Sequence, residues 1–382
     1  MSFHASFLSF VKTNYPFFKN SFSEDIFSNR MISPYKITLP KRQYKKAVQV
    51  IKAICQLKTN PLFLSKLSSD MPLAAPSSVL MSFDFYCHNN GLQLLEINTN
   101  ASGIFLAFLL EQYHGVENGI QWESIHEKFR HAFPEIKTGI AIVDESPLQQ
   151  KTYFEQEQFL RFFEYHGYPT FIWDLKDITF NAPFFKKGSQ QVKCIYNRCC
   201  DFYLSAPSAL KKAYMENPSS INPHPYDYYL FADKLRLTQF GDPLFLESLH
   251  LTEENKKNIL SVVAPAKPVS DYDIDTLWKE RKKLFFKPRQ SYGSKGSYKG
   301  ESLSKKVFEQ IVSGDYIAQP YIQAEIQHGF KYDLRFYVYQ GSVLGVVARL
   351  FQGQVTNFQT ENGGFAPVFL HEDVSRDNPS SN

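Results

Sequence analysis

The sequence predicts a mixed α/β protein of the α+β kind, with antiparallel sheets and an inserted α/β subdomain. Three observations lead to this class. Two apolar segments flank an Asn-Asn-Gly turn near residue 90, which predicts a β-hairpin. A strand–helix–strand pattern begins near residue 136 and predicts a βαβ unit. Two long alternating strands, 332–339 and 343–350, are joined by a short Gly-containing turn.

The composition indicates a compact protein built from more than one subdomain. At 382 residues the chain exceeds the usual size of a single core, so two or three subdomains that share interfaces are expected. The 35 Phe and 22 Tyr residues are numerous, and aromatic side chains bury a large area each. The net charge of +4 includes no long basic block, which argues against a nucleic-acid partner and leaves a small anionic ligand open.

The cysteines and the apolar runs indicate a reducing compartment. Five cysteines are an odd number and contain no Cys-x-x-Cys pair, so neither a disulfide framework nor a zinc site is indicated. No apolar run reaches the length of a membrane span, and the first residues lack a basic segment followed by a clean apolar core. We therefore expect a cytoplasmic protein without a membrane partner, although export by a dedicated system would leave no signal in these residues.

The first 135 residues are expected to form an N-terminal region that contains the hairpin. Its opening segment, 1–40, carries three prolines among scattered aromatics and is expected to wrap over another domain. The elements expected after it are an amphipathic helix at 42–57, strands at 79–86 and 92–97, and an apolar helix at 104–113.

Residues 136–230 are expected to form the inserted α/β substrate subdomain, with strands at 138–144, 170–173 and 193–196 and a helix at 153–166. Arg198 follows the last of these strands. An ion pair with Asp201 is the favoured interpretation. A guanidinium fixed at a strand end could equally hold a substrate carboxylate.

The remaining residues are expected to form a lid and nucleotide lobe (231–330), a region of core strands (331–372) and a disordered tail (373–382). The nucleotide lobe begins at 231–237, which is expected to be the start of a helix. It continues with mainly helical residues at 252–283 that two prolines interrupt, a short helix at 307–313, and a strand at 316–322 that Pro320 breaks.

A phosphate-binding loop is predicted where the strand 284–287 ends on Lys287 and Pro288. The strand end directs an ammonium to one spot, while Gly293 and Gly296 let backbone N–H groups approach phosphate oxygens without interference from a Cβ atom. The polar side chains of this loop are Ser291, Ser294 and Lys295. A plain surface turn explains the same pattern equally well.

Two further strands carry polar residues that favour a site. Glu96 and Asn98 lie two apart on one strand, so they share a face and offer oxygen ligands suited to Mg²⁺. The alternative, favoured when the motif is considered alone, is a solvated Glu followed by an Asn-Thr-Asn turn that caps the next helix. Asp333 and Arg335 also share a strand face, which is costly in an apolar setting unless they serve a site or satisfy each other.

Taken together, these motifs resemble those of the ATP-grasp family. In most of that family the Glu-x-Asn segment follows the lysine loop, whereas here it precedes it, so the order resembles the circularly permuted type, of which eukaryotic-type glutathione synthetase is the best-known example. Five segments are similar to that enzyme's motifs and occur in its order: Glu96-Ile97-Asn98-Thr99, Tyr196-Asn197-Arg198, Ala232-Asp233-Lys234, Lys287-Pro288-Arg289-Gln290-Ser291-Tyr292-Gly293 and Gly363-Gly364-Phe365-Ala366.

The resemblance implies a circularly permuted ATP-grasp fold with ATP and Mg²⁺ as cofactors. By position, Lys234, Lys287 and the loop residues Ser291, Gly293, Ser294, Lys295 and Gly296 would contact phosphates. The adenine slot would involve Gln319, Tyr321 and Ile322, and Glu325 would reach the ribose. Glu96 and Asn98 would hold the metal, and the catalytic arginines would be Arg198, Arg335 and Arg349.

One departure from the family concerns the metal. The family's loop glutamate falls on Ser291, and Asp333 is the predicted replacement carboxylate. The implied reaction is an ADP-forming ligation of a small carboxylate to a small amine, with the loop after Lys287 as the lid. The alternatives are a nucleotide-binding regulatory protein without ligase turnover and a small-molecule kinase. A homo-oligomer is compatible with the sequence.

Overall fold

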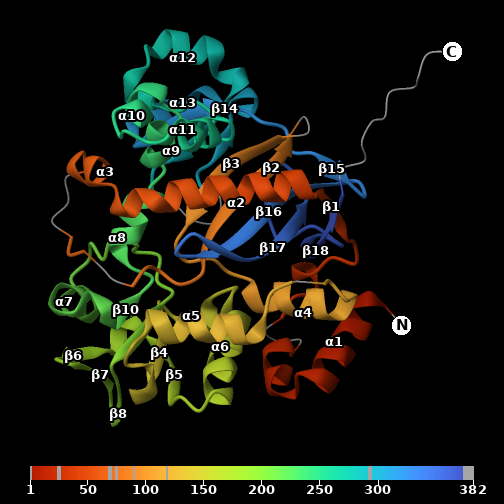
Figure 1. Ribbon diagram of the computed structural model, residues 1–382, viewed down its shortest axis with the longest axis vertical. Coiled ribbons are helices and arrows are strands. Elements are labelled where there is room, and N and C mark those ends of the chain that lie inside the picture. The colour runs from red at the N-terminus through yellow and green to blue at the C-terminus, as the bar shows by residue number, and fades with distance from the viewer. Residues whose placement is uncertain are drawn as a thin grey trace.

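The computed structural model describes residues 2–23, 27–67, 71–73, 76–88, 91–117, 119–290 and 295–372. A central sheet lies between a lobe of short helices around a small sheet and a layer of strands and helices (Figure 1). The α+β class with antiparallel sheets, predicted from the sequence, is confirmed. None of the helices in these residues is long and apolar enough to cross a membrane.

The central sheet has the strand order β1-β18-β17-β16-β2-β3, and β15 pairs with β16 beside this path. Its neighbours are antiparallel except for the parallel pair β1 and β18. The predicted hairpin and the predicted pair of long strands are both present. The strands are β1 (Ile37–Pro40), β2 (Met81–His88), β3 (Gly91–Asn98), β15 (Ile326–Gln327), β16 (Phe330–Tyr339), β17 (Ser342–Phe351) and β18 (Gly364–His371).

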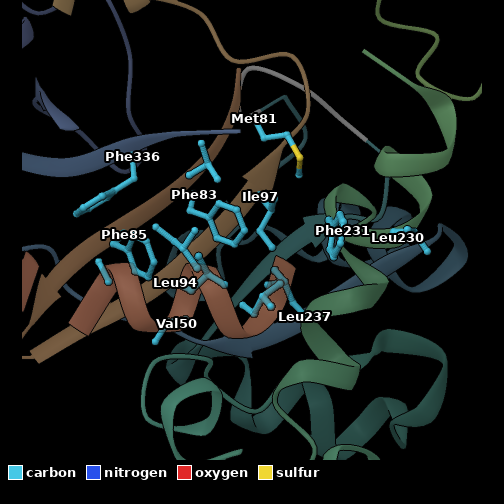
Figure 2. Close-up of a cluster of buried hydrophobic side chains, with 14 of the residues drawn as sticks. Val50, Met81, Phe83, Phe85, Leu94, Ile97, Leu230, Phe231, Leu237 and Phe336 are labelled. Atoms are coloured by element: carbon cyan, nitrogen blue, oxygen red, sulfur yellow. The ribbon is translucent and has the colours of Figure 1, made fainter. Parts of the chain in front are cut away.

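The core of the sheet forms beneath the long helix α2 (Lys41–Cys55), which matches the predicted amphipathic helix and crosses one face of the sheet (Figure 1). Figure 2 shows Phe83, Phe85 and Leu94 of the hairpin beside Val50 of this helix. Alternate hairpin residues point into this core, and each large apolar side chain contributes about 1.5–3 kcal/mol when it is fully buried. The burial fixes the orientation of the hairpin, and the opposite face remains available for polar residues.

The predicted βαβ unit is present in a second, parallel sheet of order β10-β9-β4-β5. Its strands are β4 (Ile140–Asp144), β5 (Thr170–Asp174), β9 (Cys194–Asn197) and β10 (Ile221–Asn222). Its helices are α5 (Trp122–Ala132), α6 (Tyr153–Tyr165), α7 (Ala209–Glu216) and the short α8 (Pro225–Asp227). A small antiparallel sheet of β6 (Thr179–Asn181), β7 (Phe184–Lys187) and β8 (Gln190–Val192) extends this layer.

The third lobe surrounds an antiparallel sheet of order β11-β14-β12-β13. The strands are β11 (Lys267–Pro268), β12 (Leu284–Pro288), β13 (Tyr298–Lys299) and β14 (Tyr316–Pro320). The helices are α9 (Leu235–Phe240), α10 (Pro243–Glu247), α11 (Glu253–Leu260), α12 (Ile274–Glu280) and α13 (Lys305–Ser313). The predicted helix start at 231–237 is confirmed at Leu235, where α9 begins, whereas the residues before it end a π-helical turn (Tyr228–Ala232).

The N-terminal segment contains a helix that the sequence analysis did not predict. Helix α1 (Phe3–Asn14) begins at Ser2, whose hydroxyl accepts from the backbone N–H of Ala5, and it packs against α4 (Ile104–His114). Short helical turns follow at η1 (Pro16–Phe22) and η2 (Asn29–Met31), and α3 (Pro61–Ser65) comes after α2. The predicted tail, 373–382, lies outside the described residues.

Candidate active site

The candidate metal site lies where β2 and β3 face each other. Asp84 on β2 is the cross-strand partner of Glu96, and Asn98 follows two residues later on β3. The Asn98 amide nitrogen lies 3.2 Å from Asp84 Oδ2, 3.4 Å from Glu96 Oε1 and 3.4 Å from Ser82 Oγ. The alternative role as a helix cap is wrong, because α4 begins after Gly103 with no side-chain cap.

These oxygens suit a hard cation. Three acceptor oxygens surround one amide group at long hydrogen-bond distances, and an amide can be turned over without moving its neighbours. In that orientation Asn98 Oδ1 would converge with the carboxylates of Asp84 and Glu96, which is the ligand chemistry of Mg²⁺. Among the described residues no three Asp, Glu, His or Cys side chains group as ligands, so an amide oxygen is needed to complete the set.

Sequence reasoning missed Asp84. The signal was present, because a single carboxylate lies between Phe83 and Phe85 in a mainly apolar strand. In the structure Asp84 is fully buried. Burial opposes its ionisation, but the positive charges of Arg335 and Arg349 outweigh this and hold the pKa of the Asp84 carboxyl below its usual range.

Two lysines from distant segments lie beside the same strand. Lys287, at the end of β12, donates from Nζ to the Leu95 carbonyl at 2.8 Å. Lys234, just before α9, has its Nζ 3.9 Å from Glu96 Oε2. Both lysines are buried. Burial and the nearby charge of Lys234 lower the pKa of Lys287 to about 8, although Glu96 and Asp84 act in the opposite direction.

A buried network of two carboxylates and two guanidinium groups lies next to this cluster. Arg335 binds both oxygens of Asp84, with Nε at 2.9 Å and Nη2 at 2.6 Å. Arg349 binds both oxygens of Asp333, at 2.7 and 2.8 Å, and its Nη2 also lies 2.9 Å from Asp84 Oδ2. Asp333 and Arg335 share a strand face as predicted, but each pairs with a residue of the neighbouring strand.

This network bears on the predicted metal role of Asp333. Both oxygens of Asp333 accept from Arg349, and Thr356 donates to Oδ2 as well. The carboxylate that lies directly beside Asn98 and opposite Glu96 is that of Asp84. Direct ligation by Asp333 stays a prediction. Asp84 has the better position for a ligand, but its two oxygens also accept from arginines, so a cation would share Asp84 with Arg335 and Arg349.

Arg198 joins the parallel sheet to the segment that follows β3. Its guanidinium pairs with Glu155 of α6 at 3.1 Å, donates to Ser102 Oγ at 2.8 Å and contacts the Asn100 side chain. The favoured pairing with Asp201 is wrong, because the Asp201 carboxylate instead accepts from the backbone N–H groups of residues 205 and 206.

The same segment is held from the central sheet. The Ser102 carbonyl accepts from Tyr337 Oη at 2.8 Å and from Arg335 Nη1 at 3.3 Å. Gly103 has φ +94° and lies against the Phe365 ring, so a Cβ atom there would come within 2.2 Å of a ring carbon. The residues that follow β3 are therefore held in place both by the central sheet and by the layer of the parallel sheet.

The predicted adenine and ribose residues lie along β14 and the chain that follows it. Gln319 is buried on β14 and faces Phe285 of β12. The Tyr321 ring lies 4.5 Å beneath the Lys299 ammonium, and Ile322, the next residue, is half-buried. Glu325 accepts from Tyr332 Oη at 3.3 Å. These residues extend from the sheet of β11, β14, β12 and β13 to the central sheet. Their contacts with a nucleotide stay predictions.

Only part of the predicted phosphate loop lies within the described residues. Lys295 is exposed, and Gly296 has φ +71°, a conformation that L side chains rarely adopt. Ser291, Gly293 and Ser294 lie outside the described residues. Two surface depressions, one at α10 and α11 and one at η1 and α6, include none of the residues of this site.

No protein-family model and no curated protein matches the chain. Among solved structures it is similar to a protein of Methylobacillus flagellatus KT named "Putative gamma-glutamylcysteine synthetase", with 9% identity, 83% of this chain and 84% of that chain covered, and a TM-score of 0.47. It is also similar to the ATP-grasp ligase PsnB, complexed with minimal precursor, Mg and ADP, with 11% identity, 63% and 92% coverage, and a TM-score of 0.23. At TM-scores this low neither likeness carries a functional assignment.

Proposed function

We propose that this chain is an ATP-dependent, ADP-forming carboxylate–amine ligase. The observation that carries the proposal is the convergence on β3 of two buried lysines, a carboxylate pair and an amide. Lys287 and Lys234 come from segments that lie far from Glu96 in the sequence, yet both contact β3. Buried like charges are costly, and an arrangement that collects them beside potential metal ligands suits a bound polyphosphate.

The charge balance of the cluster supports a nucleotide triphosphate. Asp84 and Asp333 are neutralised by Arg335 and Arg349. The two lysines and Glu96 together carry one excess positive charge. A divalent cation held by Glu96, Asn98 and Asp84 would raise that excess, and the phosphates of ATP would then offset it. When bound, Mg²⁺ supplies charge neutralisation for the β- and γ-phosphates.

The proposed reaction has two steps. A carboxylate oxygen of the first substrate attacks the γ-phosphorus in line and ADP leaves; the amine of the second substrate then attacks the acyl carbon and phosphate leaves. Lys234 and Lys287 would orient the phosphates and neutralise charge that develops on them. Arg349 keeps Nη1 without a hydrogen bond to the described residues, and it would face the acyl phosphate.

In this proposal the nucleotide would lie between the central sheet and the sheet of β11, β14, β12 and β13. Gln319, Tyr321 and Ile322 would line the adenine slot, and Glu325 would reach the ribose. The support is their placement on one continuous segment whose strand, β14, pairs with β12, the strand that carries Lys287. The position of the base relative to the lysines would then be set by the register of β12 and β14.

A second candidate is an ATP-binding protein without ligase turnover. The observation that favours it concerns the hydrogen bonds of two of the predicted catalytic arginines. Arg198 commits all four terminal N–H groups to protein acceptors, so it has none left to hold a substrate carboxylate. Arg335 commits one N–H of each terminal nitrogen to the protein. The replacement of the loop glutamate by Ser291 agrees with this candidate. A small-molecule kinase would use the same phosphate site.

Nucleotide binding is tested first, by the thermal shift on addition of ATP with Mg²⁺ to the wild-type chain and to Lys287→Met, Glu96→Ala and Lys306→Met. Lys306 is an exposed lysine of the same lobe and serves as the matched control. We expect a shift for the wild type and the control, and none for the other two variants. No shift for the wild-type chain would refute all three candidates, because each of them binds ATP.

Turnover is tested by release of ADP and phosphate across a panel of amino acids, small peptides and polyamines, with mass spectrometry of the products. An amide product identifies the ligase, and a stable phosphorylated product identifies the kinase. ATP binding without release by any member of the panel favours the protein without turnover. A Glu96→Ala variant that turns over at the full rate would refute the metal assignment.

A further inference from the structure

A fully buried carboxylate, that of Asp233, joins three segments next to the two lysines. Arg289 Nε lies 2.9 and 3.0 Å from its two oxygens. The hydroxyl of Tyr203 donates to Oδ2, and the backbone N–H of Leu235 donates to Oδ1 at 3.0 Å. Asp233 thereby brings together residues of the α/β layer, the start of α9 and the end of β12.

The contact between Asp233 and Arg289 lies next to both lysines in the sequence. Asp233 immediately precedes Lys234, and Arg289 follows Lys287 by two residues. The two backbones also meet, because the N–H of Lys234 points to the Arg289 carbonyl at 3.4 Å. The ion pair and this backbone contact therefore tie the two lysine-bearing segments together.

The local backbone explains why such a tie is needed. The π-helical turn at 228–232 ends before α9 begins, so Lys234 lies in a break between two helical segments. A residue in such a break is not held by regular backbone hydrogen bonds on both sides. On the other side, Arg289 is the first residue after β12, where the candidate phosphate loop begins.

We propose that Asp233 and Arg289 form a positioning pair that sets the spacing of Lys234 and Lys287 for the phosphates of ATP. Neither residue is assigned a contact with the nucleotide. The inference rests on the proposed function, because the spacing of two lysines matters to activity only if both bind the same phosphates. Tyr203 extends the pair to the α/β layer, which is expected to hold the substrates.

The same arginine offers a matched control. Arg289 Nη1 also lies 3.6 Å from the carboxylate of Asp315, whose side chain is 70% exposed. An exposed ion pair at that distance contributes little. Asp315→Asn therefore removes one carboxylate from the same guanidinium without changing the buried tie, whereas Asp233→Asn removes the buried one.

The experiment measures the Kd for a fluorescent ATP analogue with Mg²⁺, and the KM for ATP where turnover is found, at a temperature well below the thermal midpoint of every variant. The variants are Asp233→Asn, Arg289→Gln, the double variant and Asp315→Asn. The double variant carries no unpaired buried charge, so it stays informative if a single variant fails to fold. Arg289→Lys keeps the charge with a different geometry and tests rescue.

We expect Asp233→Asn and Arg289→Gln each to weaken nucleotide binding about tenfold or more, because a displaced lysine loses about one charged hydrogen bond to the phosphates. The double variant should match the single variants, because the two residues act as one pair. Arg289→Lys should be intermediate, and Asp315→Asn should stay within about twofold of the wild type.

A purely structural role gives a different result. The thermal midpoint would then fall while the Kd of the folded variants stayed that of the wild type, and this outcome would overturn the proposed pair. Equal weakening by Asp315→Asn would also overturn it, because the effect would then be one of general charge. If the wild-type chain binds no nucleotide, the proposed function itself fails and the pair falls with it.

Discussion

Lys287 is held in the folded chain at an energetic cost, and removing its charge should stabilise the protein. Its side chain is buried, and burial together with the charge of Lys234 lowers its pKa from 10.5 to about 8. A depressed lysine pKa means that the folded state holds the proton less tightly than the unfolded chain does. We therefore expect Lys287→Met to unfold at a higher temperature than the wild type at neutral pH.

The size of the effect follows from the pKa. The difference between 10.5 and about 8 corresponds to about 3 kcal/mol, at 1.36 kcal/mol for each pKa unit. Replacement by Met leaves the Leu95 carbonyl without its donor, which costs about 1 kcal/mol. The net gain expected near pH 7 is about 2 kcal/mol, or about 2–3 °C in the thermal midpoint of a chain of this length.

The pH dependence has a definite sign. Below about pH 8 the lysine is protonated in both states, and the folded state carries the whole cost. Between about pH 8 and 10.5 the unfolded chain binds more protons than the folded one, so the free energy of unfolding of the wild type rises with pH in this window. Lys287→Met lacks this contribution, so its advantage over the wild type should disappear as the pH rises through the window.

The assay compares thermal midpoints of the wild type, Lys287→Met and the control Lys306→Met across this pH range. Other groups titrate in every variant and cancel in the differences. The control should follow the wild type at each pH, because its side chain is exposed. The reasoning is refuted if Lys287→Met is less stable than the wild type at neutral pH, or if the difference between them does not change with pH.

Three further predictions concern the neighbouring groups. Asp84→Asn should lower the free energy of unfolding, measured by urea titration, by about 3–5 kcal/mol, because it leaves buried guanidinium charge uncompensated. A loss below about 1 kcal/mol would contradict the network of Asp84, Arg335 and Arg349. Gly103→Ala should lower the free energy of unfolding by more than about 2 kcal/mol, because Gly103 has a positive φ and lies against the Phe365 ring. The thermal midpoint measures this loss, and an unchanged midpoint would contradict the contact. Mg²⁺ alone should not shift the thermal midpoint. Mg²⁺ together with ADP at about 100 times its Kd should stabilise the chain by about 2.7 kcal/mol. A shift with Mg²⁺ alone would refute a site at which the cation and the nucleotide bind together.

Local patterns were sufficient to predict most of the secondary structure. The hairpin, the βαβ unit and the pair of long strands depend on alternation and turn residues within a few positions of each other, and all three are present. β18 was not predicted although it pairs with the preceding strand β17, because its sequence contains Pro367 and its other partner, β1, lies far away in the chain. A strand that depends on distant pairing has little signal of its own.

The site residues divide along the same line. Glu96 and Asn98 could be selected from the sequence because their spacing on one strand is a local fact. Asp84 could not be placed beside them, because that requires the register of β2 against β3, including its irregularity after Asp84. Arg198 was assigned the nearby Asp201, whereas its partner Glu155 lies 43 residues away on α6. Ion pairs formed across elements are set by packing, which a single sequence does not reveal.

The role of Glu96 connects the metal site with the lysines. Its carboxylate lies 3.9 Å from the Lys234 ammonium and also faces Asp84 and Asn98. Without a ligand it offsets the charge of buried lysines. A cation bound to Glu96 would take over that carboxylate and leave the two ammonium groups uncompensated in a poorly solvated position. Phosphate oxygens would restore the balance, so the cation and the nucleotide should bind together, each weakly without the other.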